Sequence, residues 1–566
     1  MRFVFVFALL FVGCLSSPEW WEDATFYQIY PRSFVDSDGD GVGDLKGISS
    51  KLEYLKEIGV TATWLSPIFK SPMADFGYDV SNFFEIDPIF GTMADFDELI
   101  EKSKEVGVKI ILDFVPNHSS DECEYFEKSV ESDPEYKDFY VWHPGKLIDG
   151  IRHPPSNWVS VFGGSTWTWN EKRQEYYLHQ FLAKQPDFNF RNPKVRENFK
   201  AILKFWLDKG VYGFRIDAVP HIFEKLNEDG SWPDEPRNDW NNDPQSYDYL
   251  DHIYTKDQHE TLDVMYEWRA FMDSYKNDNG GETRVILAEA YSPIEILDQY
   301  FSNSTHSGSQ IPFNFGLMSL SGYSTAKDVE NSVTYWMDVM WKKHKVANWV
   351  LGNHDNPRIY DRFGAHKIDV VNILLSSLPG TTVTYYGEEL GMHNVKTECT
   401  EVSCDDRDGE RTPMQWNDKL SGGFSTNPNP WLPLADDYKV NNVKNQRKTA
   451  RSSFNIYKSL QKLKRTEAFK NFKDDSSWAY GALTEQIFHV KRSSSKDGYL
   501  ILINMGDKIE TYNFPENFFK PGIKDLEYHV VTERSSHYSG EKFQITNKLH
   551  LLPFEAVVMK WETPVV

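Results

Sequence analysis

The chain has 566 residues, of which 84 are acidic and 61 are basic, so its formal net charge at pH 7 is −23. This charge argues against a nucleic-acid partner, because nucleic acids are held mainly by Lys and Arg contacts to phosphate. Aromatic residues make up 15% of the chain. Disordered sequences are poor in aromatic residues, so we expect the chain to fold throughout. At about 150 residues per domain, the length allows three or four domains.

The N-terminus has the pattern of a secretory signal peptide. Arg2 is followed by an apolar run from Phe3 to Leu15, and small residues come directly after the run. The run is too short for a membrane-spanning helix, which needs about 20 apolar residues. We therefore predict a signal peptide at residues 1–16, a secreted extracellular protein and no membrane anchor.

Secretion sets expectations for the cysteines and the glycosylation sequons. In an oxidising compartment, Cys399 and Cys404, which lie five residues apart, are expected to form a small local disulfide. Cys123 then stays unpaired. Asn303 lies in a loop-like segment and is the expected glycosylation site, whereas Asn117 lies inside a candidate catalytic motif and is expected to carry no glycan.

Eight short apolar segments are predicted as strands: 26–30, 61–67, 109–115, 213–219, 284–291, 311–317, 347–353 and 381–387. Amphipathic, helix-like stretches such as 49–58 and 95–106 lie between several of them. Alternation of strands and helices predicts a parallel sheet. Eight such units predict an α/β fold of the (β/α)8 TIM-barrel type, with its functional site at the C-terminal ends of the strands.

Two further regions depart from this alternation. About a hundred residues separate the third and fourth strands, and the part at 119–187 is rich in Trp, Pro, Gly and Ser, which predicts an inserted subdomain after strand 3. After Tyr480 the pattern changes to short strands with turns, which predicts an antiparallel β domain. The expected division is a catalytic barrel at 17–480 and a C-terminal β domain at 481–566.

Carboxyl groups follow three of the predicted strands. Arg215 and Asp217 lie two residues apart and therefore on one face of a strand. A neighbouring guanidinium is expected to lower the pKa of Asp217, which suits a nucleophile. Glu289 ends an apolar run that favours its protonated form, which suits a general acid. With Asp355 at a third strand end and no Cys or His metal ligands beside them, these groups predict glycosyl transfer. Taken singly, each has the alternative of a structural salt bridge.

Five motifs occur along the chain: DFVPNH at 113–118, QPDFN at 185–189, GFRIDAVPH at 213–221, ILAEAY at 286–291 and GNHDNPR at 352–358. Their order and spacing resemble the α-amylase superfamily of glycoside hydrolases, and within it the insect maltases, which are α-glucosidases. The resemblance implies a retaining mechanism, with Asp217 as nucleophile, Glu289 as acid/base and Asp355 as stabiliser of the transition state.

The same resemblance implies residues that bind the substrate. His118, Arg215 and His354 would bind hydroxyl groups of the sugar whose bond is cut, and Tyr78 would stack beneath its ring. The partner is therefore a small oligosaccharide, and the sequence gives no oligomeric state.

The resemblance also implies how the pocket selects its substrate. Asp75 and Arg358 would close it behind the non-reducing end, so that one terminal glucose is released per event. Ala218, directly after the nucleophile, favours α-1,4 over α-1,6 linkages. The expected substrates are maltose, maltooligosaccharides and sucrose, with transglycosylation as a side reaction.

A metal-binding loop is predicted at 36–44, where glycines alternate with aspartates: Asp36, Asp38, Asp40 and Asp44. Oxygen ligands in a glycine-bent loop suit a hard cation. The loop starts like an EF-hand, but Gly47 replaces the Glu at position twelve. Resemblance to the metal loop of related α-glucosidases implies a structural Ca²⁺, with Mg²⁺ as the alternative and the Val42 carbonyl as a further ligand. A solvated acidic turn is the competing interpretation.

One further motif, RDGERTPMQW at 407–416, also matches the family and is expected to form a loop near the pocket mouth, with no role assigned. Two alternative functions stay open at this point. An endo-α-amylase is disfavoured by the predicted Asp75–Arg358 closure. A non-catalytic role like that of the amino-acid-transporter heavy chains, which carry a membrane-spanning segment before the barrel, is disfavoured by the signal peptide. A binding role, for instance as a receptor, stays open beside catalysis.

Overall fold

The computed structural model describes residues 18–342, 345–397, 405–470 and 475–562. The predicted signal peptide and the predicted disulfide between Cys399 and Cys404 lie outside these ranges. Within the described ranges, no helix combines the length and the apolar character that crossing a membrane requires.

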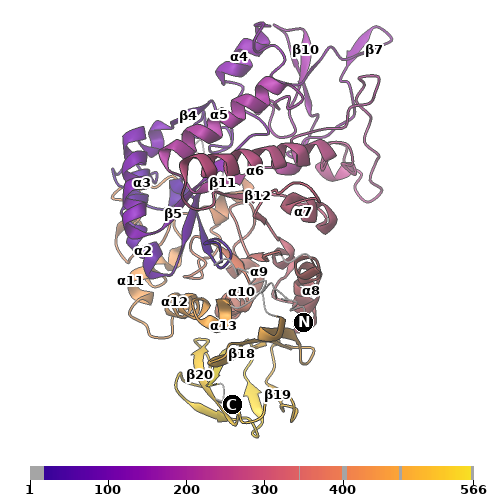
Figure 1. Ribbon diagram of the computed structural model, residues 1–566. Helices are drawn as coiled ribbons and strands as arrows, with labels where there is room; N and C mark the ends of the chain where they lie inside the picture. Colours follow the sequence, from indigo (N-terminus) through magenta and orange to yellow (C-terminus); the bar gives the residue numbers. More distant parts are fainter. Residues whose placement is uncertain (1–17, 343–344, 398–404, 471–474, 563–566) are drawn as a thin grey trace, which may run out of the picture.

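Parallel strands form the centre of the molecule (Figure 1). They are β1 (Thr25–Ile29), β2 (Ala62–Leu65), β5 (Lys109–Phe114), β11 (Gly213–Ile216), β12 (Val285–Ala288), β13 (Ile311–Pro312), β14 (Asn348–Val350) and β15 (Thr381–Tyr385). Their spatial order is β13-β12-β11-β5-β2-β1-β15-β14, which is a nearly closed barrel. Each strand overlaps one of the eight predicted segments, and the predicted (β/α)8 class is confirmed.

Side chains join the two end strands of this sheet, β13 and β14. The Asn348 side chain accepts a bond from the Asn314 backbone N–H (2.8 Å) and donates one to the Pro312 carbonyl (2.7 Å). Asn314 donates in turn to the Asn348 carbonyl (3.2 Å). Buried backbone N–H and C=O groups need hydrogen-bond partners. Between β13 and β14, Asn314 and Asn348 supply these partners.

Helices pack around the outside of the barrel: α1 (Leu45–Ser49), α2 (Leu52–Glu57), α3 (Met93–Val106), α5 (Pro193–Lys209), α6 (His259–Asn279), α7 (Ile294–Phe301), α8 (Ala326–Lys342), α9 (Ile359–Phe363), α10 (Ile368–Ser377), α11 (Val443–Gln446), α12 (Ser453–Lys464) and α13 (Glu467–Lys470). Local sequence sets their ends. Helix α3 starts with a capping box between Thr92 and Asp95 and ends at Gly107, whose φ of 84° is left-handed.

Apolar side chains fill the barrel interior: Ala24, Phe26, Ala62, Trp64, Ile111, Val285, Leu287, Ile311, Phe313, Val350 and Val383. Each such side chain contributes about 1.5–3 kcal/mol when it is fully buried. The interior is therefore a packed core. Polar groups that belong to the site have room only at the C-terminal rim of the strands.

Two regions extend from the barrel at opposite ends of the molecule (Figure 1). The insertion after β5 holds helix α4 (Glu124–Val130), a sheet of β6 (Trp142–His143), β10 (Glu175–Leu178) and β9 (Trp167–Asn170), and a hairpin of β7 (Lys146–Ile148) and β8 (Ile151–His153). A smaller pair, β3 (Phe69–Lys70) and β4 (Asn82–Ile86), follows β2.

The C-terminal region is an antiparallel β domain, as predicted. Its main sheet runs in the order β16 (Trp478–Ala482), β17 (Ile487–Ser493), β18 (Asp497–Asn504), β23 (Ala556–Glu562), β20 (Asp525–Val531) and β21 (Lys542–Gln544). A second pair is β19 (Glu510–Tyr512) and β22 (Leu549–Leu551). The boundary expected at 480/481 falls inside β16.

Candidate active site

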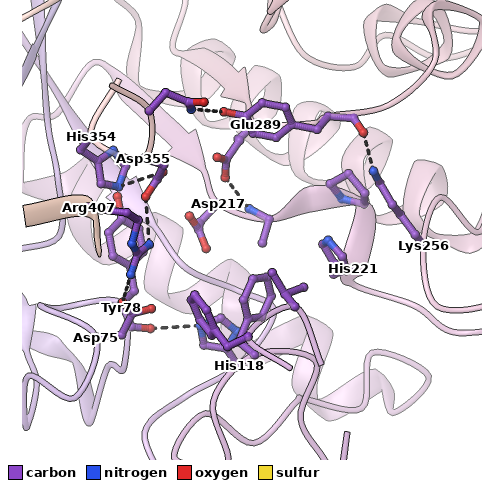
Figure 2. A pocket seen from close by; sticks show the side chains of 17 residues that line it. Asp75, Tyr78, His118, Asp217, His221, Lys256, Glu289, His354, Asp355 and Arg407 are labelled. Atoms are coloured by element: carbon purple, nitrogen blue, oxygen red, sulfur yellow. Dashed lines mark hydrogen bonds and ion pairs between the residues drawn. The ribbon is translucent and has the colours of Figure 1, made fainter. Parts of the chain in front are cut away.

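A cavity of about 350 Å³ lies at the C-terminal ends of the strands (Figure 2). Eight of the predicted site residues line it: Asp75, Tyr78, His118, Asp217, Ala218, Glu289, His354 and Asp355. Arg215 lies behind the lining, and Arg358 is not part of it. The cavity therefore brings together carboxyl groups that are far apart in the sequence.

Arg215 joins three carboxyl groups beneath the cavity floor. It lies opposite Asp113 in the register of β11 and β5. Its Nη1 donates to Asp113 Oδ1 (2.9 Å) and to Asp217 Oδ1 (2.6 Å), and its Nη2 lies 2.7 Å from Glu289 Oε2. The side chain is only 2% exposed. Arg215 thus fixes Asp217 and Glu289 relative to each other, and its expected contact with the sugar stays a prediction.

Burial raises the pKa of both central carboxyl groups. It raises the pKa of Glu289 to about 8, in the direction of the expected protonated form. It also raises the pKa of Asp217 to about 7, with Arg215 acting against it and Asp113 reinforcing it. The prediction that Arg215 makes the pKa of Asp217 low is therefore wrong, because burial and a second carboxylate outweigh one shared guanidinium. Burial thus acts in the same direction on Asp217 and Glu289, and Arg215 opposes it at both.

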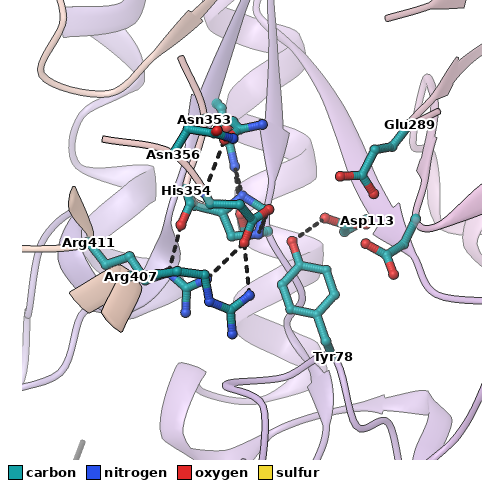
Figure 3. A network of polar contacts seen from close by, with 12 residues as sticks. Tyr78, Asp113, Glu289, Asn353, His354, Asn356, Arg407 and Arg411 are labelled. Atoms are coloured by element: carbon teal, nitrogen blue, oxygen red, sulfur yellow. Dashed lines mark hydrogen bonds and ion pairs between the residues drawn. The ribbon is translucent and has the colours of Figure 1, made fainter. Parts of the chain in front are cut away.

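Asp355 is held in its ionised form. Burial acts to raise its pKa, but His354, Arg411 and Arg407 outweigh burial and keep the pKa well below its ordinary value. Asp355 Oδ1 accepts bonds from Arg407 (3.0 Å) and Arg411 (2.9 Å). Figure 3 shows both arginines beside His354. Gln28 donates to His354 Nδ1 (2.9 Å), so the proton of the neutral ring is on Nε2, 3.3 Å from Asp355.

Asp75 pairs with Arg407 in the lining of the cavity, and not with Arg358 as expected. Arg407 Nη2 donates to Asp75 Oδ1 (3.0 Å), while its Nη1 donates to Asp355. Arg358 is 2% exposed and donates to the Tyr386 carbonyl (2.7 Å). The assignment of Arg358 is corrected because its side chain turns into the core, where its guanidinium lies over Tyr386.

Tyr78 and His118 form another part of the cavity lining. The Tyr78 ring stacks on His354 at 5.3 Å and 7°, and its hydroxyl donates to Asp113 (3.0 Å). His118 contacts the Tyr78 carbonyl through Nε2 (3.1 Å). Burial lowers the pKa of His118 to about 3. Both side chains are thus neutral, rigidly held groups beside the carboxylates.

Ala218 has a strained backbone beside the catalytic pair. Its φ of 48° is left-handed, a conformation that residues other than glycine adopt mainly where their surroundings enforce it. Its N–H donates to Glu289 Oε2 (3.0 Å). Because Oε2 also faces Arg215, the proton of a protonated Glu289 belongs on Oε1.

Sequence reasoning assigned no role to several residues of the site: Phe162, Phe181, His221, Lys256, Tyr291, Arg407 and Arg411. The two arginines belong to the motif at 407–416, which lies at the cavity as predicted. Of the other five, His221 ends the motif GFRIDAVPH and Tyr291 ends the motif ILAEAY, whereas Phe162, Phe181 and Lys256 lie outside the five motifs.

The predicted metal loop brings three carboxylates together. Ligand atoms of Asp36, Asp38 and Asp40 lie within 4.8 Å of one another, and the loop bends at Gly39 (φ 86°). Asp44 does not join this group, because its carboxylate caps helix α1 through the Gly47 N–H (2.7 Å). Burial and the neighbouring carboxylates raise the pKa of Asp40. Clustered carboxylates of this kind suit a hard cation.

Comparison with known proteins shows which family the chain resembles. Residues 28–472 match the family model for the α-amylase catalytic domain. The chain is 60% identical to Maltase A2 of Drosophila melanogaster over 96% of its own length and 95% of the relative's. It is 47% identical to a salivary α-glucosidase of Aedes aegypti, over 89% of each chain. An α-glucosyl transfer enzyme of known crystal structure has a TM-score of 0.81 and 33% identity, with 96% of this chain and 100% of that chain covered.

The chain therefore belongs to the α-amylase family of glycoside hydrolases. Within that family its close relatives are insect maltases and α-glucosidases, and it is an enzyme of the α-glucosidase type.

Proposed function

We propose that the protein is a secreted, retaining exo-α-glucosidase that releases terminal α-1,4-linked glucose from maltose, maltooligosaccharides and sucrose. The observation that carries the proposal is the Asp75–Arg407 pair beside Asp217, Glu289 and Asp355. An ion pair across one end of the cavity leaves no path for a longer chain beyond the first sugar, which favours exo over endo action.

The first step forms a covalent intermediate. Asp217 Oδ1 accepts a bond from Arg215, so Oδ2 is the oxygen that attacks the anomeric carbon. Glu289 donates its Oε1 proton to the glycosidic oxygen as the carbon–oxygen bond breaks, and the bonding electrons leave with that oxygen. The products are a glucosyl ester of Asp217, a free sugar and an ionised Glu289.

The second step regenerates the enzyme. Ionised Glu289 takes a proton from water, and the water oxygen displaces Asp217 from the anomeric carbon. Two inversions give net retention of the α configuration. In both steps the sugar ring carries positive charge in the transition state, and Asp355 remains ionised beside it. A second sugar in place of water gives transglycosylation.

Retention needs nucleophile and acid about 5–5.5 Å apart. Asp217 and Glu289 bond to the two different terminal nitrogens of one guanidinium, Arg215, which supports a short, fixed separation. The preference for α-1,4 linkages is supported by Ala218, a small side chain that lines the cavity directly after the nucleophile.

We also propose a structural Ca²⁺, or Mg²⁺ in its place, held by Asp36, Asp38 and Asp40, with the Val42 carbonyl as a further ligand. The donor set fits, because all three side chains offer carboxylate oxygen within one glycine-bent loop. Bound metal would neutralise clustered negative charge and hold this loop against Ser425, whose hydroxyl donates to Asp36 (2.5 Å).

Secretion and a glycan at Asn303 are part of the same proposal. The predicted signal peptide and a salivary relative at 47% identity support secretion. Asn303 is exposed, as a glycosylation site must be.

The test is product analysis on maltoheptaose, with the anomer followed by NMR. Exo action with retention gives α-glucose and maltohexaose as the first products. Early release of maltose and maltotriose without glucose would refute exo action, and β-glucose would refute retention.

A further inference from the structure

The side chain of Lys256 is a positively charged group of the cavity that lies away from the Asp75–Arg407 pair. Lys256 is part of the lining, on the opposite side of Asp217 and Glu289 from the Asp75–Arg407 pair (Figure 2). In the proposed function the closed end receives the glucosyl unit. Lys256 therefore lies at the end that receives the leaving sugar.

The Lys256 ammonium has donors available for a ligand. It donates to the backbone carbonyl of Tyr291, two residues beyond Glu289. Within the described part of the chain, no other acceptor is bonded to it. An ammonium has three N–H donors, so two of them remain for oxygen atoms in the cavity.

A buried carboxylate shapes the loop that presents Lys256. Glu235 is 3% exposed and accepts bonds from three successive backbone N–H groups, those of Ile253 (2.9 Å), Tyr254 (2.7 Å) and Thr255 (2.8 Å). Successive amides that converge on one carboxylate form an anion-binding turn. The backbone is thereby fixed up to the residue that precedes Lys256.

Strained residues flank this turn on both sides. His252 has a φ of 51° and Asp257 a φ of 57°, both in the left-handed region. The Ser292 hydroxyl donates to Asp257 (2.5 Å), which ties the end of the turn to the segment after Glu289. Left-handed residues other than glycine persist where their surroundings over-determine them, and they cluster at binding sites.

Glu235 also holds a second loop of the cavity. Its backbone N–H donates to the Asn157 side chain (2.8 Å), and that side chain donates to the Glu235 carbonyl (2.9 Å). Asn157 lies five residues before Phe162, an aromatic residue that lines the cavity from the inserted subdomain. Glu235 thus joins the loop that presents Lys256 to a loop of the inserted subdomain that also reaches the cavity.

We propose that Lys256 is a specificity-determining residue that donates hydrogen bonds to hydroxyl groups of the leaving sugar, and that Glu235 is the positioning residue that holds it there. The inference rests on the proposed α-glucosidase activity. It predicts that the enzyme distinguishes leaving groups that carry hydroxyl groups from aryl leaving groups through Lys256.

The test compares maltose with 4-nitrophenyl α-glucoside, which share the glucosyl half and differ in the leaving group. Lys256→Met keeps the length of the side chain and removes its donors. We expect kcat/KM for maltose to fall about tenfold, the usual effect of losing a hydrogen bond to a charged group, and kcat/KM for the aryl glucoside to stay within about twofold. Lys225→Met is the matched control, because Lys225 is exposed and its backbone N–H donates to the Tyr254 carbonyl of the same loop (2.7 Å). It should leave both substrates unchanged.

Glu235→Gln tests the positioning role. A neutral amide offers one acceptor oxygen in place of two, so we expect a selective loss on maltose, with a raised KM and little change in kcat on the aryl glucoside. The double variant Glu235→Gln/Lys256→Met should lose little more than Lys256→Met alone. If Glu235→Gln does not fold, Thr255→Val removes the hydroxyl bond to Glu235 (3.0 Å) together with the contact to His252 Nδ1 (3.1 Å), keeps the three backbone bonds to Glu235 and should give a smaller loss of the same kind.

Two results would overturn the inference. An unchanged ratio of maltose to aryl glucoside activity in Lys256→Met, whether both rates fall or neither does, would exclude a contact with the leaving sugar. Additive losses in the double variant would exclude the positioning role of Glu235. Failure of the wild type to cleave either substrate would instead refute the proposed function, so the two failures are distinguishable.

Discussion

Replacement of Arg407 is the sharpest perturbation of the closed end of the cavity. Its guanidinium bonds Asp75 and Asp355 at 3.0 Å each and also pairs with Asp405. Arg407→Met removes all of these contacts while it keeps a long apolar side chain. Asp355 retains its bond to Arg411 (2.9 Å), so the change leaves the transition-state carboxylate partly held and acts mainly on the closure.

The magnitude follows from the two contacts that face the cavity. A hydrogen bond to a charged group contributes about 1.5–3 kcal/mol, so losing those to Asp75 and Asp355 costs at least about 3 kcal/mol. Each 1.36 kcal/mol is a factor of ten in rate, and we therefore expect kcat/KM for maltose to fall about a hundredfold. Arg407→Lys keeps the charge but not the two-armed geometry and should recover part of the loss.

The assay measures kcat/KM on maltose together with the thermal unfolding of each variant. Arg358→Met is the contrasting variant, because Arg358 bonds the Tyr386 carbonyl in the core and does not line the cavity. It should lower the stability but leave kcat/KM of the folded enzyme within about threefold. If Arg407→Met kept a near-normal kcat/KM and a well-folded Arg358→Met were inactive, the role of Arg407 would be refuted. The pairing of Asp75 with Arg358 that the sequence suggested would then be favoured again.

Three further predictions concern the acid, the pH profile and the metal. Glu289→Gln should lower kcat on maltose by about 10²–10⁴-fold, and less on 4-nitrophenyl α-glucoside, whose leaving group needs no proton; equal losses would contradict an acid role. Activity needs ionised Asp217 and protonated Glu289. As the pH rises, kcat/KM should therefore increase through the raised pKa of Asp217 and then decrease through the pKa of Glu289, about 8. A flat profile, or a decrease that begins below about pH 5, would contradict the assignment. A chelator or Asp36→Asn should lower the unfolding temperature with little change in kcat. Metal at a hundred times its Kd should raise the free energy of unfolding by about 2.7 kcal/mol. An unfolding temperature that does not change with metal or chelator would refute the metal site.

The catalytic carboxylates could be predicted because they depend on topology. Asp217, Glu289 and Asp355 each follow a short apolar segment, and parallel strands bring their C-terminal ends to one rim. The barrel itself could be predicted for the same reason, from the alternation of strand-like and helix-like segments.

Pairings made across loops could not be predicted in this way. Arg407 meets Asp75 across 332 residues and Asp355 across 52. No periodicity relates these positions, and the neighbouring motif offered Arg358 as an equally basic candidate. Only the direction of the Arg358 side chain, into the core beside Tyr386, decides between them.

Competing uses of one side chain explain the remaining differences. Asp44 has the spacing of a fourth metal ligand, but it is also the N-cap of helix α1, and the cap uses its carboxylate. The pKa of Asp217 was expected to be low from its neighbour Arg215, but Asp113 shares that guanidinium, and a strand pairing decides this contact.

The most direct test of the central claim is to trap the covalent intermediate. A fluorinated α-glucosyl fluoride that slows the second step should attach one glucosyl unit, and mass spectrometry of the digested protein should locate it on the peptide that contains Asp217. We expect this label on the wild type and its loss in Asp217→Asn. A label on another residue, or inactivation without any label, would contradict Asp217 as the nucleophile.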